Sequence, residues 1–123
     1  MENYDYIESG LILGLTEKKN FGKFKYTSQD FAQHGDAFKF VNKYLDSYGE
    51  LPSETTICEN YPTLDDSAKN LTFDYALDTF KDQVLFRQVV GSFQKNKALL
   101  LEKPKDAYAQ IVTALQDIGL VYD

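Results

Sequence analysis

A chain of 123 residues has the usual length of one domain and is long enough to bury a hydrophobic core. Hydrophobic residues make up 43% and charged residues 26%, which excludes an intrinsically disordered chain. The formal net charge of −6 argues against a general nucleic-acid-binding protein, because phosphate binding requires an excess of cationic side chains.

The start of the chain and its single cysteine predict a cytoplasmic location. Met1 is followed by an acidic stretch rather than a basic one, which excludes a conventional secretory signal. The apolar runs are too short to span a membrane. Because Cys58 has no partner in the chain, no internal disulfide can form, and a reducing compartment is favoured.

The aromatic content predicts the composition of the core. The chain has nine Phe and nine Tyr but no Trp. Because large rings fill volume efficiently and the tyrosine hydroxyl needs a polar partner, we expect a core built around Phe with Tyr at its margins.

Residues 4–15 form the first predicted helix, with apolar side chains at i, i+4 and i+8: Ile7, Leu11 and Leu15. Gly10 and Gly14 weaken this helix but allow another helix to approach it closely. Residues 17–26 are expected to form a connector.

Two further helices are predicted before the middle of the chain. Residues 36–48 place apolar side chains at 3, 4, 3 spacing, and Gly49 is expected to end this helix. Ser53 is a typical N-cap for a short helix over residues 53–61, which must end before Pro62. The acidic segment 63–71 is expected to be a loop.

A long helix is predicted over residues 72–102, with two apolar stripes. The first half places Phe73, Leu77, Phe80 and Val84 at 4, 3, 4 spacing, and the second half places Phe86, Val90, Phe93, Lys97 and Leu100 at 4, 3, 4, 3 spacing. At about 100° per residue the two stripes point roughly 150° apart. The two halves should therefore be covered from different sides, the first by the preceding short helices and the second by the chain after residue 102.

A short turn at Lys103-Pro104-Lys105 leads to the last predicted helix, residues 106–118, whose stripe is Tyr108, Ile111, Leu115 and Ile118. So short a turn favours an antiparallel helical hairpin with the long helix. The expected fold is a single all-α domain with a globular helical cluster (1–84), a hairpin (85–118) and the start of a linker (119–123).

Charge is unevenly distributed along the chain. Residues 50–82 contain eight acids and two bases, a net −6, whereas residues 83–105 contain five bases and one acid, a net +4. Separated acidic and basic surfaces suit self-association or an oppositely charged partner, although two solvated helix faces would give the same pattern.

The residues indicate no catalytic centre, no metal site and no cofactor. No glycine-rich phosphate loop is present, and His34 and Cys58 are the only residues of their kinds. We expect His34 to be solvated or locally hydrogen-bonded, and Cys58 to be a small buried hydrophobic side chain. One enzymatic alternative is a cation bound by the acidic row Asp74, Asp78 and Asp82, although such a row is more often a solvated face.

Two other segments suggest binding surfaces. Bases and aromatic residues interleave over residues 18–26, which could bind single-stranded nucleic acid or could simply anchor a connector through its Phe side chains. We favour the anchored connector and expect no strong direct nucleic-acid binding. The run Leu99-Leu100-Leu101 covers more of its helix than a hairpin requires, so either another subunit covers the excess or the hairpin tip is simply crowded.

The order of these elements resembles the N-terminal domain of DnaB-type replicative DNA helicases, especially phage-encoded ones. The resemblance covers residues 37–118 and rests on helix punctuation: a helix ending at a Gly turn, a Leu-Pro-Ser entry into a short helix, a long helix with Arg87 near its middle, and a hairpin. The first 35 residues match less well. The family's ATPase motor is not in this chain and would come after residue 123.

The resemblance implies a collar domain that has no enzymatic activity of its own, assembles into a homo-oligomer through its hairpins, and receives a primase or a helicase loader. The residues expected at the protein interface are Phe86, Arg87, Val90, Phe93, Leu100, Tyr108, Ile111 and Leu115. Arg87 lies off the apolar stripe and is expected to reach an acidic neighbour. The alternative is a stand-alone helical adaptor of a phage or bacterium, acting as a helicase loader or inhibitor.

Overall fold

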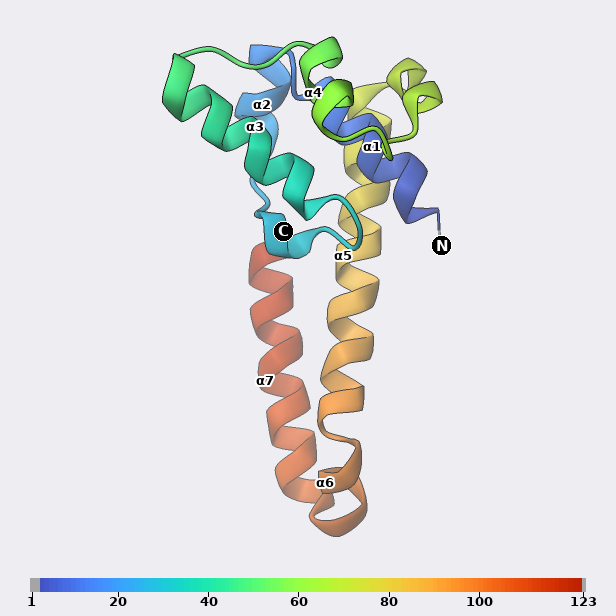
Figure 1. The fold of residues 1–123 in the computed structure, drawn as a ribbon. Helices are drawn as coiled ribbons and strands as arrows, with labels where there is room; N and C mark the ends of the chain where they lie inside the picture. The colour runs from blue at the N-terminus through green and yellow to red at the C-terminus, as the bar shows by residue number, and fades with distance from the viewer. Residues whose placement is uncertain (1–2, 123) are drawn as a thin grey trace. The chain divides into compact units, whose positions relative to one another are not determined.

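The computed structural model describes residues 3–122, and side chains only as far as Ile118, and it confirms the predicted all-α class (Figure 1). No strand occurs in the described part of the chain. Within the same residues, none of the helices combines the length and the apolar character needed to cross a bilayer. The elements are α1 (Tyr4–Gly14), α2 (Lys18–Lys23), the 3-10 helix η1 (Ser28–Asp30), α3 (Gly35–Tyr48), α4 (Glu54–Asn60), the 3-10 helix η2 (Asp66–Asn70), α5 (Phe73–Lys95), α6 (Lys97–Glu102) and α7 (Pro104–Tyr122).

The chain forms two compact units, which divide between Phe80 and Lys81 and are called unit 1 (Met1–Phe80) and unit 2 (Lys81–Asp123). The sequence had suggested a division between residues 84 and 85. Helix α5 contributes its first part to unit 1 and the remainder to unit 2.

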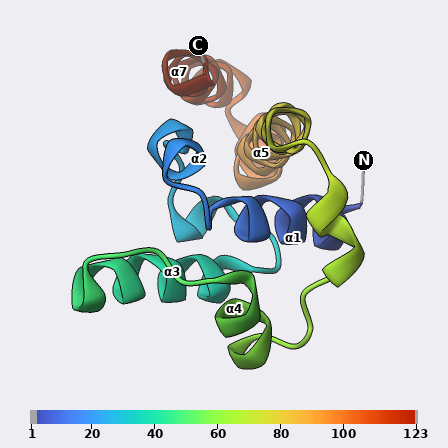
Figure 2. The ribbon, with the colours of Figure 1, turned by 90° about the horizontal axis from the view of Figure 1, so that it is seen from above.

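Helix α1 lies at the centre of unit 1, between α3 and the beginning of α5 (Figure 2). Its side chains Leu11 and Ile12, and Leu15 directly after it, have no exposed surface. A Cβ atom on Gly10 would lie only 2.9 Å from Leu71 Cδ1 and 3.2 Å from the Ala68 carbonyl oxygen. Gly10 therefore allows close approach, as predicted, and the element that approaches is η2 together with the residue after it.

Four phenylalanines form the aromatic core of unit 1: Phe24, Phe31, Phe38 and Phe80. The Phe31 ring lies 4.9 Å from the Phe80 ring and 5.2 Å from the Phe38 ring, centroid to centroid. At the margin of this cluster the half-buried Tyr26 meets Phe80 edge-on at 5.2 Å. This arrangement confirms the predicted Phe core with Tyr at its edge.

Local capping determines where several helices begin and end. Gly49 adopts a left-handed conformation (φ 72°) after α3, and the Ser53 hydroxyl accepts a hydrogen bond from the Thr56 amide at 3.2 Å before α4, both as predicted. The expected connector and loop were wrong in part, because they contain α2 and η2. The Asn20 side chain ties α2 to the Gly14 carbonyl at 2.9 Å, and the Asp65 carboxylate caps η2.

The long helix predicted over residues 72–102 is interrupted at Asn96, which separates α5 from α6. Asn96 has φ −102° and ψ 8°, and its side chain donates a hydrogen bond to the Ser92 carbonyl at 2.8 Å. Asparagine is common at helix ends because its side chain bonds nearby backbone groups. The same bond made by Asn42 to the Phe38 carbonyl leaves α3 unbroken, so this bond alone does not explain the break.

In unit 2 the chain reverses at α6, and α7 runs in the direction opposite to the second part of α5 (Figure 1). Helix α7 packs against α6, while close pairing of α7 with α5 along a hairpin stays a prediction. Helix α7 begins at Pro104 rather than Asp106, since proline is favoured at the first helical position. It also continues past the predicted end at Ile118, through Gly119, to Tyr122. Asp123 lies outside the described residues.

Candidate functional site

Large apolar side chains are exposed on all three helices of unit 2. Phe86 and Phe93 lie seven residues apart on α5 and are 46% and 48% exposed. Leu100 and Leu101 extend this exposure to α6, where Leu101 reaches 83%. We call the exposed apolar set of unit 2 its apolar surface; it consists of Phe86, Phe93, Leu100, Leu101, Tyr108 and Leu115.

The remaining predicted interface residues differ in how far their side chains are buried. Ile111 is buried at 6%, and the buried line on α7 joins it to Ala107 at 0% rather than to Tyr108. Tyr108, which the predicted stripe on α7 includes, is 70% exposed. Val90 is half-buried, as is Arg87, whose Nε atom is shielded from solvent.

Leu101 is the residue of this surface that the predicted interface list omitted. The run Leu99-Leu100-Leu101 indicated in the sequence that one of these residues would be exposed, because three adjacent apolar residues cannot all lie on one face of a helix.

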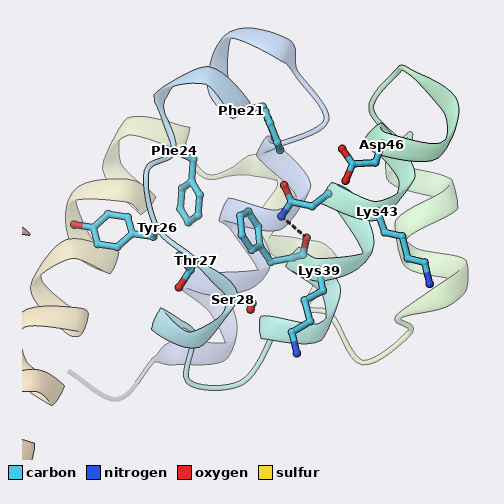
Figure 3. Close-up of a pocket in the computed structure, with 10 residues that line it drawn as sticks. Phe21, Phe24, Tyr26, Thr27, Ser28, Lys39, Lys43 and Asp46 are labelled. Atoms are coloured by element: carbon cyan, nitrogen blue, oxygen red, sulfur yellow. Dashed lines mark hydrogen bonds between the residues drawn. The ribbon is translucent and has the colours of Figure 1, made fainter.

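A second candidate site is an open cleft of about 650 Å³ in unit 1, between the α2–η1 region and α3 (Figure 3). Its floor is formed by Phe21, Phe24 and Phe38. The remaining lining residues are polar or amphipathic: Tyr26, Thr27, Ser28, Lys39, Asn42, Lys43 and Asp46. The basic and aromatic segment 18–26 indicated one wall of this cleft, but the wall supplied by α3 was missed.

Several polar groups of the cleft have defined partners. The Thr27 amide and hydroxyl both donate to the Asp30 carboxylate, at 2.8 and 3.3 Å. The Asn42 side-chain nitrogen donates to the Phe38 carbonyl at 3.1 Å, which leaves the carbonyl oxygen and the second N–H of the Asn42 amide for other partners. Burial, and to a lesser degree the Asp30 carboxylate, raises the pKa of Tyr26, which keeps its hydroxyl protonated at neutral pH.

Unit 1 also contains a buried polar network that holds α1 against the segment before α3. The Glu8 carboxylate is fully buried and accepts hydrogen bonds from the backbone amides of Ala32, Gln33 and His34 at 2.7, 2.9 and 2.9 Å. The His34 ring Nε2 lies 2.6 Å from Asp5 Oδ1. The expectation of a solvated or locally bonded His34 was wrong, because its partners lie far back in the sequence on α1. This network gives the buried Glu8 carboxylate and the His34 ring hydrogen-bond partners, so both groups have a structural role.

Cys58 is half-buried on α4, so it is less enclosed than predicted. Burial raises the pKa of its thiol first of all, the carboxylates of Asp66 and Glu54 raise it further, and Lys69 opposes them. A raised pKa keeps the sulfur in its unreactive thiol form at neutral pH.

The acidic row on α5 contacts a basic side chain in unit 1, where Lys23 Nζ lies 3.2 Å from Asp74 Oδ1. Across the described residues, no three His, Cys, Asp or Glu side chains gather in a way that could hold a metal ion. The two candidate sites are the apolar surface of unit 2 and the cleft of unit 1.

No protein-family model matches this chain, and neither does any curated protein or any solved structure to which it was compared.

Proposed function

We propose that this chain is a protein–protein interaction domain that self-associates through the apolar surface of unit 2. The observation that carries the proposal is the exposure of large apolar side chains on each of α5, α6 and α7. Single exposed hydrophobic residues are common on monomers, whereas several large ones within one small unit are typical of an interface. Burying a fully exposed side chain of this size contributes about 1.5–3 kcal/mol. Phe86 and Phe93 are about half exposed and would each contribute roughly half of that, so several of these side chains must be covered together to offset the entropic cost of association.

The uneven charge of the chain supports association with a second surface of opposite sign. Residues 83–105 carry a net +4 and belong to unit 2, whereas residues 50–82 carry a net −6 and lie mainly in unit 1. Complementary charge of this kind speeds encounter and fixes the orientation of partners.

The narrower proposal is that the chain serves as the collar domain of a DnaB-type replicative helicase, in a phage-infected or bacterial cytoplasm. Its support is the resemblance over residues 37–118. In that role unit 2 would join copies of the chain into a ring, and the assembled collar would receive a primase or a helicase loader. The alternative is a helical adaptor that docks on a helicase. A gene that continues past residue 123 into a phosphate-binding loop would favour the collar, and a stop codon there would favour the adaptor.

Substituting Phe93 tests the self-association. Phe93 is 48% exposed, so Phe93→Asp should leave the fold intact and place a charge on the apolar surface. Sedimentation velocity over a range of concentrations should show an oligomer for the wild type and a monomer for Phe93→Asp. The matched control is Gln94→Asp, which puts the same charge on the neighbouring exposed position and should still associate.

Circular dichroism should give equal helicity for the three proteins. A wild type that stays monomeric at its highest soluble concentration would contradict the proposal. So would a Phe93→Asp variant that associates as strongly as Gln94→Asp.

A further inference from the structure

We propose that the cleft of unit 1 is a docking site for a short acidic segment of a partner protein, one that places an apolar side chain between carboxylates. This cleft lies in unit 1, and its use does not depend on the self-association assigned to unit 2. None of its lining residues belongs to the apolar surface.

The floor of the cleft fits an apolar side chain. Phe24 and Phe38 are 8% and 7% exposed, so they present only part of their rings, and Phe21 is half-buried beside them. The volume of about 650 Å³ is within the range of cavities that enclose a small ligand or a few side chains. An aromatic or branched aliphatic group entering this space would displace water from ring surfaces that the fold leaves partly uncovered.

The rim of the cleft fits carboxylates. Lys39 and Lys43 line the cleft one helical turn apart on α3, and both are exposed. In Figure 3 their side chains run outward into solvent, away from Phe21 and Phe24. The one acidic residue of the lining is Asp46, so the lining carries a net charge of +1 in a chain of net charge −6, and its rim is complementary to an acidic partner.

The remaining lining groups favour a peptide over a nucleic acid. Asp46 and the Asn42 carbonyl oxygen are acceptors that need donors, and the Thr27 and Ser28 hydroxyls can donate or accept. A peptide backbone supplies both N–H and C=O groups, whereas a phosphodiester backbone supplies acceptors only. Two of the four core rings are also too buried to offer the flat exposed faces on which bases stack.

The probe for the test is a short fluorescein-labelled peptide with a central phenylalanine flanked by aspartates. The chain, at 14.1 kDa, suits NMR titration, which locates the site while fluorescence anisotropy measures the affinity. We expect the peptide to shift backbone amides within residues 21–28 and 38–46. Replacing its phenylalanine with alanine, or its aspartates with asparagine, should weaken binding about tenfold each, which corresponds to one apolar contact or to two surface ion pairs.

Charge reversal on the protein separates the cleft from general electrostatic attraction. Lys39→Glu combined with Lys43→Glu should weaken binding at least about tenfold, since each substitution replaces an attraction with a repulsion. The matched control, Lys103→Glu with Lys105→Glu, changes the net charge equally on exposed residues of unit 2 and should bind as the wild type does.

Four outcomes would overturn the inference: no peptide binding at millimolar concentration, equal loss in the two double variants, amide shifts confined to unit 2, or preferential binding of oligothymidine at the same cleft. Retention of peptide binding by Phe93→Asp would show that the cleft works independently of self-association, and its loss would count against a separate site.

Discussion

Replacing Glu8 with alanine should destabilise unit 1 by about 3 kcal/mol. The Glu8 carboxylate is fully buried and accepts three backbone hydrogen bonds from residues 32–34, at 2.7–2.9 Å. Hydrogen bonds to a charged group each contribute roughly 1.5–3 kcal/mol, which would sum to about 4–9 kcal/mol. Ala32 and Gln33 are exposed, so water can satisfy their amides once the carboxylate is gone, whereas the amide of the buried His34 is left without an acceptor. A loss somewhat below that range is therefore expected.

Urea unfolding followed by circular dichroism, together with tyrosine fluorescence, measures this loss. For a unit of about this size, 3 kcal/mol corresponds to a fall in the unfolding temperature of roughly 15 °C. Glu8→Gln keeps the shape and one acceptor oxygen but turns an NH₂ group toward the amides, so it should cost about 2 kcal/mol. The control is Glu59→Ala on the exposed surface of α4, which should stay within about 0.5 kcal/mol of the wild type. A loss below about 1 kcal/mol for Glu8→Ala would refute the idea that this carboxylate holds the segment before α3.

Two glycines in helices should respond to alanine with opposite signs, as measured by thermal unfolding. Gly91→Ala should stabilise α5 by up to about 1 kcal/mol, because its Cβ meets no atom within 4 Å. Gly10→Ala should destabilise by about 1 kcal/mol, because its Cβ meets the backbone carbonyl oxygen of Ala68 at 3.2 Å as well as Leu71 Cδ1 at 2.9 Å; equal effects would contradict this. The Cys58 thiol should be alkylated slowly at neutral pH, with a rate that rises through a midpoint above the ordinary thiol pKa, and Asp66→Asn should move that midpoint down. A midpoint at or below the ordinary value would show that burial and nearby carboxylates do not control this sulfur.

Much of the fold could be predicted because local chemistry specified it. The positive φ of Gly49 and the Ser53 cap depend on neighbouring residues alone, so the ends of α3 and α4 could be located in the sequence. Asn96 was not recognised as a break, because the apolar period of the sequence continues past it. The short helices α2 and η2 were missed since each is held in part by contacts, such as that of Asn20 with Gly14, that no periodic pattern indicates.

The candidate sites were predictable only to the extent that they lie on one element. Helical spacing sets the stripe through Phe86 and Phe93, but the expected covering of this stripe by the chain after residue 102 was wrong for both rings, which are about half exposed. On α7 the spacing chose Tyr108, whereas the small Ala107 is the residue that the packing buries. The cleft combines α2 with α3, and a sequence pattern cannot show which faces of two short helices will meet.

The central position of α1 determines how far the chain can be shortened. This helix, with the residue after it, contributes Leu11, Ile12 and Leu15 to unit 1, all without exposed surface. A fragment trimmed to residues 37–118 would lack the centre of the hydrophobic core of unit 1, although it would keep α3, α4 and the start of α5. The first 35 residues are therefore part of the folding unit, and substitutions in α1 must preserve its apolar volume.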